Sequence, residues 1–238
     1  MASKTTIPLS IMIKLFGLHE GGPIMISDHV EQYLESLRPN REGLIKQIEE
    51  YAEENHVPIM EQTSLDVMLQ LLSFLKPKRI LEIGAAIGYS AIRMAERLPD
   101  TAILTVERDE TRYNEAIANI DKAGYSDQIT VLFGDAFDLA HDLKQYGPYQ
   151  ALFIDAAKGQ YKRFFDEFYS ELEEGGIVFS DNILFRGLVA EDEIEEKRFK
   201  SMVKKLRLYN EFLISHPELD TTIYPIGDGL AVSQRKNS

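Results

Sequence analysis

The sequence predicts an α/β fold built on a doubly wound, mostly parallel sheet. Two observations predict it: short apolar runs alternate with helix-length segments from Arg79 onward, and several of these runs end in Gly, Asp or Glu. Alternation of this kind is typical of right-handed βαβ units around a buried parallel sheet. The chain has 238 residues, and single cores keep growing to roughly 250 residues. We therefore expect one domain over residues 28–238, without a linker or an internal repeat.

Residues 1–27 are expected to form an N-terminal extension that lies outside this domain and need not be ordered, with Met25 as an alternative start. The apolar stretch from Ile7 to Leu18 contains Lys14 and is shorter than the ~20 residues that a membrane span needs. It continues into His19 to Pro23 rather than into a small-residue cleavage site, which argues against a signal peptide. The alternative is a docked helix that covers a dimer or substrate surface.

Three helices are expected before the first strand. They begin at Asp28, at Glu42 and near Gln62, and they end at Arg38-Pro39, at about Asn55 and before Pro77. The first and third carry apolar side chains at helical spacing.

The strands are expected at seven short apolar runs, which are residues 79–83, 102–106, 129–133, 151–154, 176–179, 221–225 and 229–233. The last two are joined by Ile226-Gly227-Asp228, a connection that indicates a hairpin. We therefore expect a seven-stranded sheet with a C-terminal antiparallel strand.

The composition excludes several kinds of site. The chain has no Cys, so a disulfide framework, a Cys-ligated zinc or iron–sulfur centre and a thiol nucleophile are all excluded. A reducing, cytoplasmic location fits best.

The end of the first strand indicates a site for a small cationic ligand. Ligands of open α/β sheets bind beyond the carboxyl ends of the strands. Here Gly84 and Gly88 are four positions apart, which departs from the G-x-G-x-x-G spacing and disfavours a dinucleotide. Glu82 places a carboxylate beside this small-residue turn, where a positive group can be held. S-adenosylmethionine, with its amino group and sulfonium, suits such a site.

Acidic residues at the next two strand ends extend this interpretation to a nucleoside. Glu107 lies 23 positions after Gly84, the place from which an acidic side chain reaches ribose hydroxyls. Asp135 follows the third strand and can accept from an adenine amino group. A glycine at a strand end is usually only a turn and an acidic side chain is usually only solvated, but the signals occur in order and in phase with the strands.

Oxygen ligands follow the fourth and fifth strands. Asp155, Asp181 and Asn182 form an all-oxygen set of the kind that Mg²⁺ accepts. The alternative is structural, with Asp155 as a helix N-cap and Asp181-Asn182 as a plain turn. Lys158 comes three residues after the first ligand. A nearby cation and partial burial both disfavour its ammonium form, so we take it as a candidate general base rather than an ordinary surface lysine.

Three segments carry a resemblance to a known family, namely residues 51–60 (YAEENHVPIM), 81–95 (LEIGAAIGYSAIRMA) and 187–192 (GLVAED). Over residues 28–236 the chain resembles the cation-dependent, catechol-type S-adenosylmethionine O-methyltransferases and, within them, the bacterial tRNA 5-hydroxyuridine methyltransferases. The resemblance implies a Rossmann-like methyltransferase fold and homodimers. It implies metal ligation by Asp155, Asp181 and Asn182 and a base at Lys158. It also implies cofactor contacts from Met60, Glu82, Gly84, Ser90, Glu107, Asp135, Ala136 and Asp155.

The family chemistry leaves two substrate classes open. A bound Mg²⁺ that chelates two adjacent oxygens would activate one hydroxyl for methyl transfer. The resemblance favours 5-hydroxyuridine at the tRNA wobble position, giving 5-methoxyuridine, and small catechol-like or phenolic molecules are the alternative. A non-catalytic S-adenosylmethionine-binding module is a third hypothesis, and it would require the loss of a metal ligand or of the base.

Charge bears on this choice. The net charge of −13 argues against nucleic acid, whereas basic residues between Lys197 and Arg207, together with Arg186, indicate a contact with the anticodon backbone. A solvated helix with i,i+4 ion pairs is the alternative for that basic segment.

Overall fold

The computed structural model describes residues 29, 33–34, 36–38 and 41–237. The chain divides into two compact units, residues 1–39 and 40–238, and the fold below is that of the second. The expected extension 1–27 lies outside the described residues. Of the helix expected from Asp28, residues 28, 30–32, 35 and 39 also lie outside them, and His29, Tyr33, Leu34 and Ser36 are helical. No helix in the described part of the chain combines the length and the apolar character that crossing a membrane requires.

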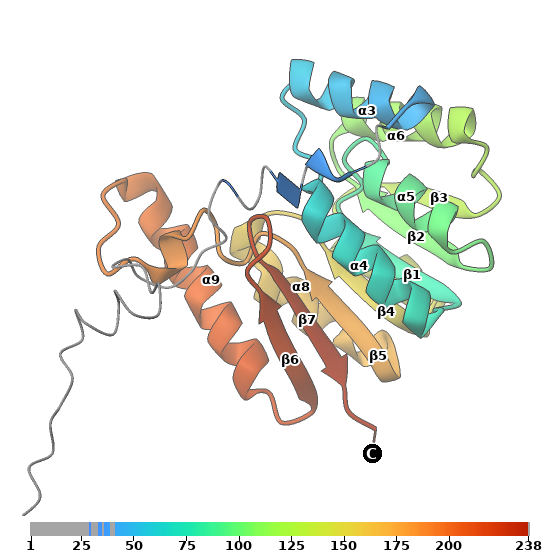
Figure 1. Cartoon of the computed structure of the whole chain (residues 1–238). Helices are drawn as coiled ribbons and strands as arrows, with labels where there is room; N and C mark the ends of the chain where they lie inside the picture. The colour runs from blue at the N-terminus through green and yellow to red at the C-terminus, as the bar shows by residue number, and fades with distance from the viewer. Residues whose placement is uncertain (1–28, 30–32, 35, 39–40, 238) are drawn as a thin grey trace, which may run out of the picture. The chain divides into compact units, whose positions relative to one another are not determined.

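The sheet has the predicted architecture (Figure 1). Within the described residues it contains seven strands, in the spatial order β3-β2-β1-β4-β5-β7-β6. Strands β1 to β5 pair in parallel, and β7 is antiparallel to both of its neighbours, as expected for a closing hairpin. Their bounds are β1 Arg79–Ile83, β2 Ala102–Glu107, β3 Ile129–Phe133, β4 Tyr149–Ile154, β5 Leu172–Ser180, β6 Leu219–Tyr224 and β7 Leu230–Arg235.

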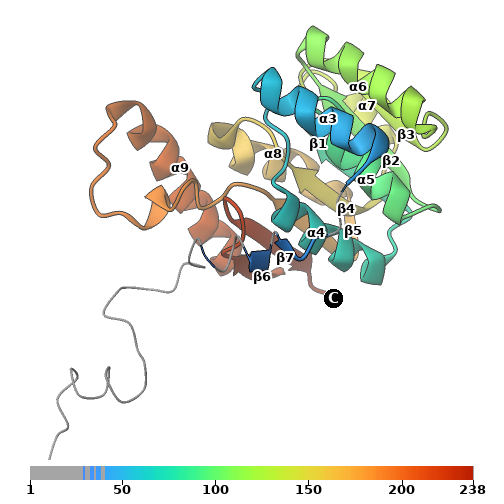
Figure 2. The ribbon, with the colours of Figure 1, turned by 45° about the horizontal axis from the view of Figure 1, so that its top comes forward.

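Helices cover both faces of this sheet (Figure 2). One face carries α3 (Gly43–Glu54), α4 (Gln62–Leu75), α5 (Tyr89–Arg97) and α6 (Glu110–Ala123). The other carries α7 (Ala140–Gln145), α8 (Tyr161–Phe168) and α9 (Lys197–Ser215). Short 3-10 turns are η1 Lys158–Gln160, η2 Tyr169–Glu171 and η3 Leu188–Ala190. The second and third helices expected from the sequence correspond to α3 and α4.

Alternation along the strands divides the core into two layers. Ile80 and Ile103 pack with α3 to α6, whereas Leu81 and Leu104 pack with α7 to α9. All four are at most 5% exposed. Burial on both faces explains why these strands are mostly apolar in the sequence.

Strand β5 begins earlier than the sequence predicts. The expected strand covered residues 176–179, but Leu172 already pairs with Tyr149, and the register shifts before Ala151. Gly175, with φ of +75°, lies in this irregular part. A glycine that bends a strand at a bulge interrupts the apolar pattern, so the sequence hides the first half of β5.

Candidate active site

A cavity of about 320 Å³ lies beyond the carboxyl ends of β1 to β4. The chain winds outward from β1 to β3 and then returns to β4 on the other side of β1. This reversal is the topological switch point at which open α/β sheets bind their ligands. The walls come from the residues that directly follow the strands, among them Gly84, Glu107, Asp135, Ala136 and Asp155. Five residues that the sequence suggests for a cofactor site therefore line one cavity.

Gly84 brings the ends of β1 and β4 together. Its φ is +107°, and a Cβ atom at this position would lie 2.1 Å from the backbone oxygen of Asp155. On the other side, the amides of Gly84 and Ala85 both donate to the Val106 carbonyl, at 3.0 Å each. Only glycine combines this backbone conformation with so close an approach.

The Glu107 carboxylate is fixed by three backbone amides. Oε1 accepts from Arg108 and Asp109, and Oε2 accepts from Ala86, all at 2.9 Å. A carboxylate has about four acceptor sites, so one site on Oε2 remains for a ligand. The side chain is 8% exposed and lines the cavity. Glu107 is thus a pre-oriented acceptor.

Asp135 and two aromatic rings form the far wall. Asp135 Oδ1 accepts from the Phe137 amide at 3.0 Å, which holds the turn after β3. The rings of Phe137 and Phe164 stack with centroids 4.6 Å apart, and both residues line the cavity. An acceptor beside an aromatic surface suits a planar heterocycle with an exocyclic amine.

Three of the expected cofactor residues lie behind the cavity wall. Glu82 is fully buried, and its two carboxylate oxygens accept from the hydroxyls of Ser90 and Thr105. Burial raises the pKa of Glu82 to about 7, against the lowering effect of these two hydrogen bonds. Ser90 and Met60 are 6% and 3% exposed and do not line the cavity. Their contacts with a cofactor stay predictions.

Asp155, Asp181 and Asn182 come together beside the cavity. Asn182 Nδ2 donates to Asp181 Oδ2 at 3.1 Å, and Asp155 and Asn182 line the cavity. Burial raises the pKa of Asp155 to about 6. Burial, and then the charge of Asp155, raise the pKa of Asp181 well above its usual range. Burial and neighbouring negative charge both disfavour the ionised form of these carboxyls, which a bound cation would favour.

One carboxylate oxygen of Asp181, Oδ1, is buried and has no hydrogen-bond partner among the described residues. Buried polar atoms are nearly always paired, so such an atom calls for an explanation. Within the described chain no three His, Cys, Asp or Glu side chains gather as a metal site. The candidate set here instead combines two carboxylates with the amide oxygen of Asn182, a donor set that Mg²⁺ accepts.

Lys158 points its ammonium group at this cluster. Its Nζ lies 2.7 Å from Asn182 Oδ1 and 5.7 Å from the centroid of the Phe185 ring. The residue begins η1, directly after the loop that follows β4. The predicted base and the predicted metal ligands therefore lie together, although they come from two different strand ends.

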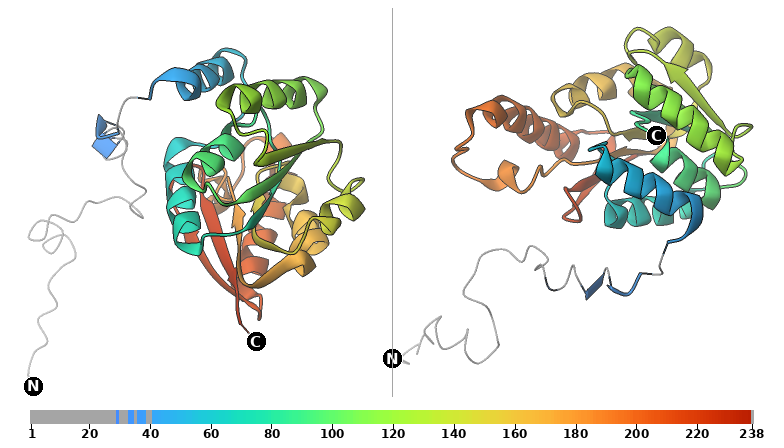
Figure 3. Two further views of the ribbon diagram at one scale, coloured as in Figure 1. Left: turned by 90° about the vertical axis from the view of Figure 1, so that its right-hand side faces the viewer. Right: turned by 90° about the horizontal axis from the view of Figure 1, so that it is seen from above.

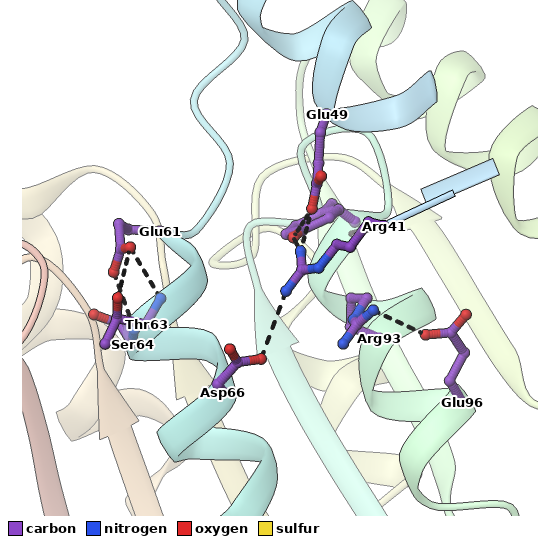
Figure 4. A network of polar contacts seen from close by, with 9 residues as sticks. Arg41, Glu49, Glu61, Thr63, Ser64, Asp66, Arg93 and Glu96 are labelled. Carbon is purple, nitrogen blue, oxygen red and sulfur yellow. Dashed lines mark hydrogen bonds and ion pairs between the residues drawn. The ribbon is translucent and has the colours of Figure 1, made fainter. Parts of the chain in front are cut away.

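The entrance to α4 adds cavity residues that sequence reasoning missed. Pro58 and Ile59 line the cavity just before the Glu61 carboxylate caps α4, accepting from the amides of Thr63 and Ser64 at 2.9 and 3.1 Å (Figure 4). An acidic N-cap before an amphipathic run is a readable signal for this turn. Nothing in the sequence at Pro58 and Ile59 themselves indicates a binding site. Arg108, Arg112, Gln160 and Phe164 were also missed as cavity residues.

The chain is similar to known proteins along most of its length. The O-methyltransferase family model matches residues 33–236. A caffeoyl-CoA O-methyltransferase of Stellaria longipes is 32% identical over 225 residues, which cover 89% of this chain and 92% of that protein. A catechol O-methyltransferase of Niastella koreensis is 30% identical over 203 residues, covering 83% of this chain and 90% of that protein.

Solved structures agree with this likeness. A Staphylococcus aureus protein assigned as a caffeoyl-CoA O-methyltransferase superposes with a TM-score of 0.81 at 36% identity, covering 86% of this chain and 98% of that one. An O-methyltransferase from Bacillus cereus in complex with SAH shares the fold at a TM-score of 0.77 and 23% identity, covering 87% of this chain and 97% of that one. The family model spans most of the chain, so this protein belongs to the O-methyltransferase family, and the enzyme class predicted from its sequence is confirmed.

Proposed function

We propose that this enzyme transfers the methyl group of S-adenosylmethionine to a hydroxyl that lies beside a second oxygen, with Mg²⁺ held by Asp155, Asp181 and Asn182. The observation that carries the proposal is a pair of neighbouring carboxyls, the half-buried Asp155 in the cavity wall and the buried Asp181, with Asp181 Oδ1 left without a partner among the described residues. The names of the catechol and caffeoyl-CoA relatives also support it, because a catechol carries two adjacent oxygens.

The cofactor would lie across the strand ends. Glu107 would accept from the ribose hydroxyls through its free Oε2 site, and Asp135 would accept from the adenine amine beside the Phe137 and Phe164 rings. Gly84 and Ala136 would allow a close approach to the backbone. The buried cluster of Glu82 and Ser90 would support this wall from behind.

When bound at Asp155, Asp181 and Asn182, the cation would supply positive charge that makes the reacting hydroxyl more acidic. The protein's own groups would do the rest. Lys158 would take the proton of that hydroxyl at Nζ. Asn182 Oδ1 would keep Nζ in place by accepting a hydrogen bond from it. The same oxygen has a second lone pair, which could serve a metal. Phe185 would keep water away from one side of Nζ.

The substrate class is suggested by a groove next to this site. It is lined by residues 158–163 together with Lys205, Leu208 and Tyr209 of α9, and it shares Lys158 and Gln160 with the cofactor cavity. Besides Lys158, three cations lie along it, namely Lys162, Arg163 and Lys205. Lys162 pairs with Asp166 at 2.6 Å, whereas Lys205 has no ion pair within the described chain.

In a chain with a net charge of −13, such a groove is a local exception. Phosphate groups are bound by Lys and Arg, so the groove favours a substrate whose reacting ring is attached to phosphate. We propose 5-hydroxyuridine in the tRNA anticodon loop, which offers O5 beside the C4 carbonyl and carries phosphates on both sides. Small phenolic or catechol substrates are the second candidate, favoured by the names of the relatives.

Two arginines of the basic segment predicted from the sequence already have hydrogen-bond or ion-pair partners within the protein. Arg207 donates to the carbonyl of Val189 at 2.8 Å and to that of Glu191, and Arg198 pairs with Glu196 at 2.7 Å. Lys205, on the same helix, therefore has the better access to an RNA backbone.

The test compares three acceptors under one condition: an anticodon stem-loop containing 5-hydroxyuridine, the free nucleoside and catechol. We expect the stem-loop to have the highest kcat/KM and to lose about 10-fold in Lys205→Glu, with the salt slope reduced by about one. Lys122→Glu, at an exposed position on α6, is the charge-matched control and should change little. A preference for catechol, or equal loss in both variants, would contradict the tRNA proposal.

A further inference from the structure

We propose that the tip of the β6–β7 hairpin, residues 225–229, is a clamp that fixes the metal-side loop of the active site, and that Asp228 is a positioning residue for methyl transfer. This inference rests on the proposed function, because it concerns the placement of Asn182 and Lys158. The hairpin tip lies at the opposite end of β7 from the C-terminus (Figure 3). That is the end at which β5 delivers Asp181 and Asn182.

Four consecutive backbone amides of the metal-side loop donate to this tip. The Ile183 amide donates to the Gly229 carbonyl at 3.0 Å. The amides of Leu184 and Phe185 both donate to the Asp228 carbonyl, at 3.0 and 3.3 Å. The Arg186 amide donates to the Asp228 carboxylate. The loop that begins directly after the last metal ligand thus depends on two hairpin residues for its hydrogen bonds.

The loop needs these hydrogen bonds because three residues in and beside it have an unfavourable backbone conformation. Asn182, Phe185 and Arg186 have φ values of +55°, +45° and +55°. For residues other than glycine, and above all for a bulky residue such as Phe185, this conformation is unfavourable and persists only where the surroundings impose it. The hydrogen bonds to Asp228 and Gly229 are the visible cause.

The other side of the same tip touches the cofactor side of the site. Ser64 Oγ donates to the Ile226 carbonyl at 3.1 Å. A Cβ atom on Gly227 would lie 2.5 Å from Ser64 Oγ and 2.7 Å from Glu61 Oε2. Glu61 and Ser64 form the N-terminal turn of α4, directly after Pro58 and Ile59 of the cavity wall (Figure 4).

The clamp therefore joins the two halves of the site. One contact surface holds the α4 entrance beside the cofactor cavity, and the other holds the loop that aims Asn182 Oδ1 at Lys158 Nζ. Asp228 is central because both its carbonyl and its carboxylate accept from the loop. Loss of its carboxylate should loosen Asn182 and Lys158 together while Glu107 and Asp135, on the far wall, keep their positions.

The test uses Asp228→Ala, Asp228→Asn and the control Asp220→Ala, the last at an exposed position on β6. We expect Asp228→Ala to lower kcat at saturating cofactor, substrate and Mg²⁺ by at least about 10-fold and to raise the Kd for Mg²⁺ alone, with the Kd for S-adenosylmethionine within about two-fold of wild type. Asp228→Asn keeps an acceptor for the Arg186 amide and should recover most of kcat. Asp220→Ala should match wild type.

Hydrogen exchange separates this inference from the proposed function. The Arg186 amide, which loses its acceptor in Asp228→Ala, should exchange at least about 10-fold faster there, with the amides of α6 unchanged, even if the wild-type enzyme proves to need no metal. If Asp228→Ala does not fold, Asp228→Ser, whose side chain is too short to reach the Arg186 amide, takes its place. Unchanged exchange at the Arg186 amide, or wild-type kcat in Asp228→Ala or in the Asp228→Ser that replaces it, would overturn the clamp.

Discussion

Gly84 offers the sharpest stability test of the site's architecture. Replacing it with Ala places a Cβ atom 2.1 Å from the Asp155 backbone oxygen, at a φ of +107°. Forcing an L-residue into positive φ costs roughly 1–2 kcal/mol, and overpacking against an immovable neighbour adds about 1–3 kcal/mol. We therefore expect a loss of about 2–5 kcal/mol in the free energy of unfolding. For a unit of this size each kcal/mol lowers the Tm by about 2–4 °C, so the loss should be plain in a thermal melt.

Gly124 supplies the matched control for this measurement. It has a φ of +78° at the end of α6, and nothing lies within 4 Å of the point that a Cβ atom would occupy there. Gly124→Ala should therefore show the conformational cost alone, about 1–2 kcal/mol. Urea unfolding of both variants gives the comparison. Equal losses in the two would refute the close approach of β1 and β4 at the cofactor site.

Three further predictions address the chemistry and the buried acid. Glu107→Ala should weaken S-adenosylmethionine binding by about 1–3 kcal/mol, because it leaves hydrogen-bonding groups of the ligand unpaired. Calorimetry measures this loss, and an unchanged Kd would show that Glu107 does not bind the ribose. Lys158→Met should keep both cofactor and metal binding but lower turnover at neutral pH by ~10²–10⁴-fold, with partial rescue at higher pH. A wild-type turnover rate in this variant would show that Lys158 is not the general base. Glu82 has its folded pKa raised to about 7 by burial. Its stabilising contribution is therefore complete below its unfolded pKa of about 4.3 and is lost as pH rises through 7. Relative to Glu82→Gln, the wild type should lose up to about 3 kcal/mol between pH 5 and 8, and a flat difference would show that the carboxyl is not buried as described.

The strand-end residues could be predicted because their position is encoded locally. An apolar run followed by Gly, Asp or Glu identifies both the strand and the edge to which its last residues belong. Asp155, Lys158 and Asn182 meet beside the cavity for this reason. Their roles, the homodimer and the cytoplasmic location stay predictions that the fold alone does not test.

Other features depend on long-range geometry that leaves no local pattern. The hydroxyls of Ser90 and Thr105 donate to the two carboxylate oxygens of Glu82, an arrangement that the sequence did not indicate. The hairpin tip holds the metal-side loop largely through backbone groups, which every residue carries. The basic groove joins Lys205 to residues far from it in the chain, so the spacing of charges along α9 could not indicate it.

The central claim is metal-dependent methyl transfer at the Asp155, Asp181 and Asn182 cluster. The most direct measurement is turnover of a 5-hydroxyuridine-containing stem-loop and of catechol by the purified enzyme, first with excess chelator and then after Mg²⁺ is added back. The structure predicts that methyl transfer to either acceptor stops in chelator and returns with Mg²⁺, and that Asp155→Ala stays inactive under both conditions while still binding S-adenosylmethionine. Full turnover in excess chelator would contradict a metal-dependent reaction at this cluster.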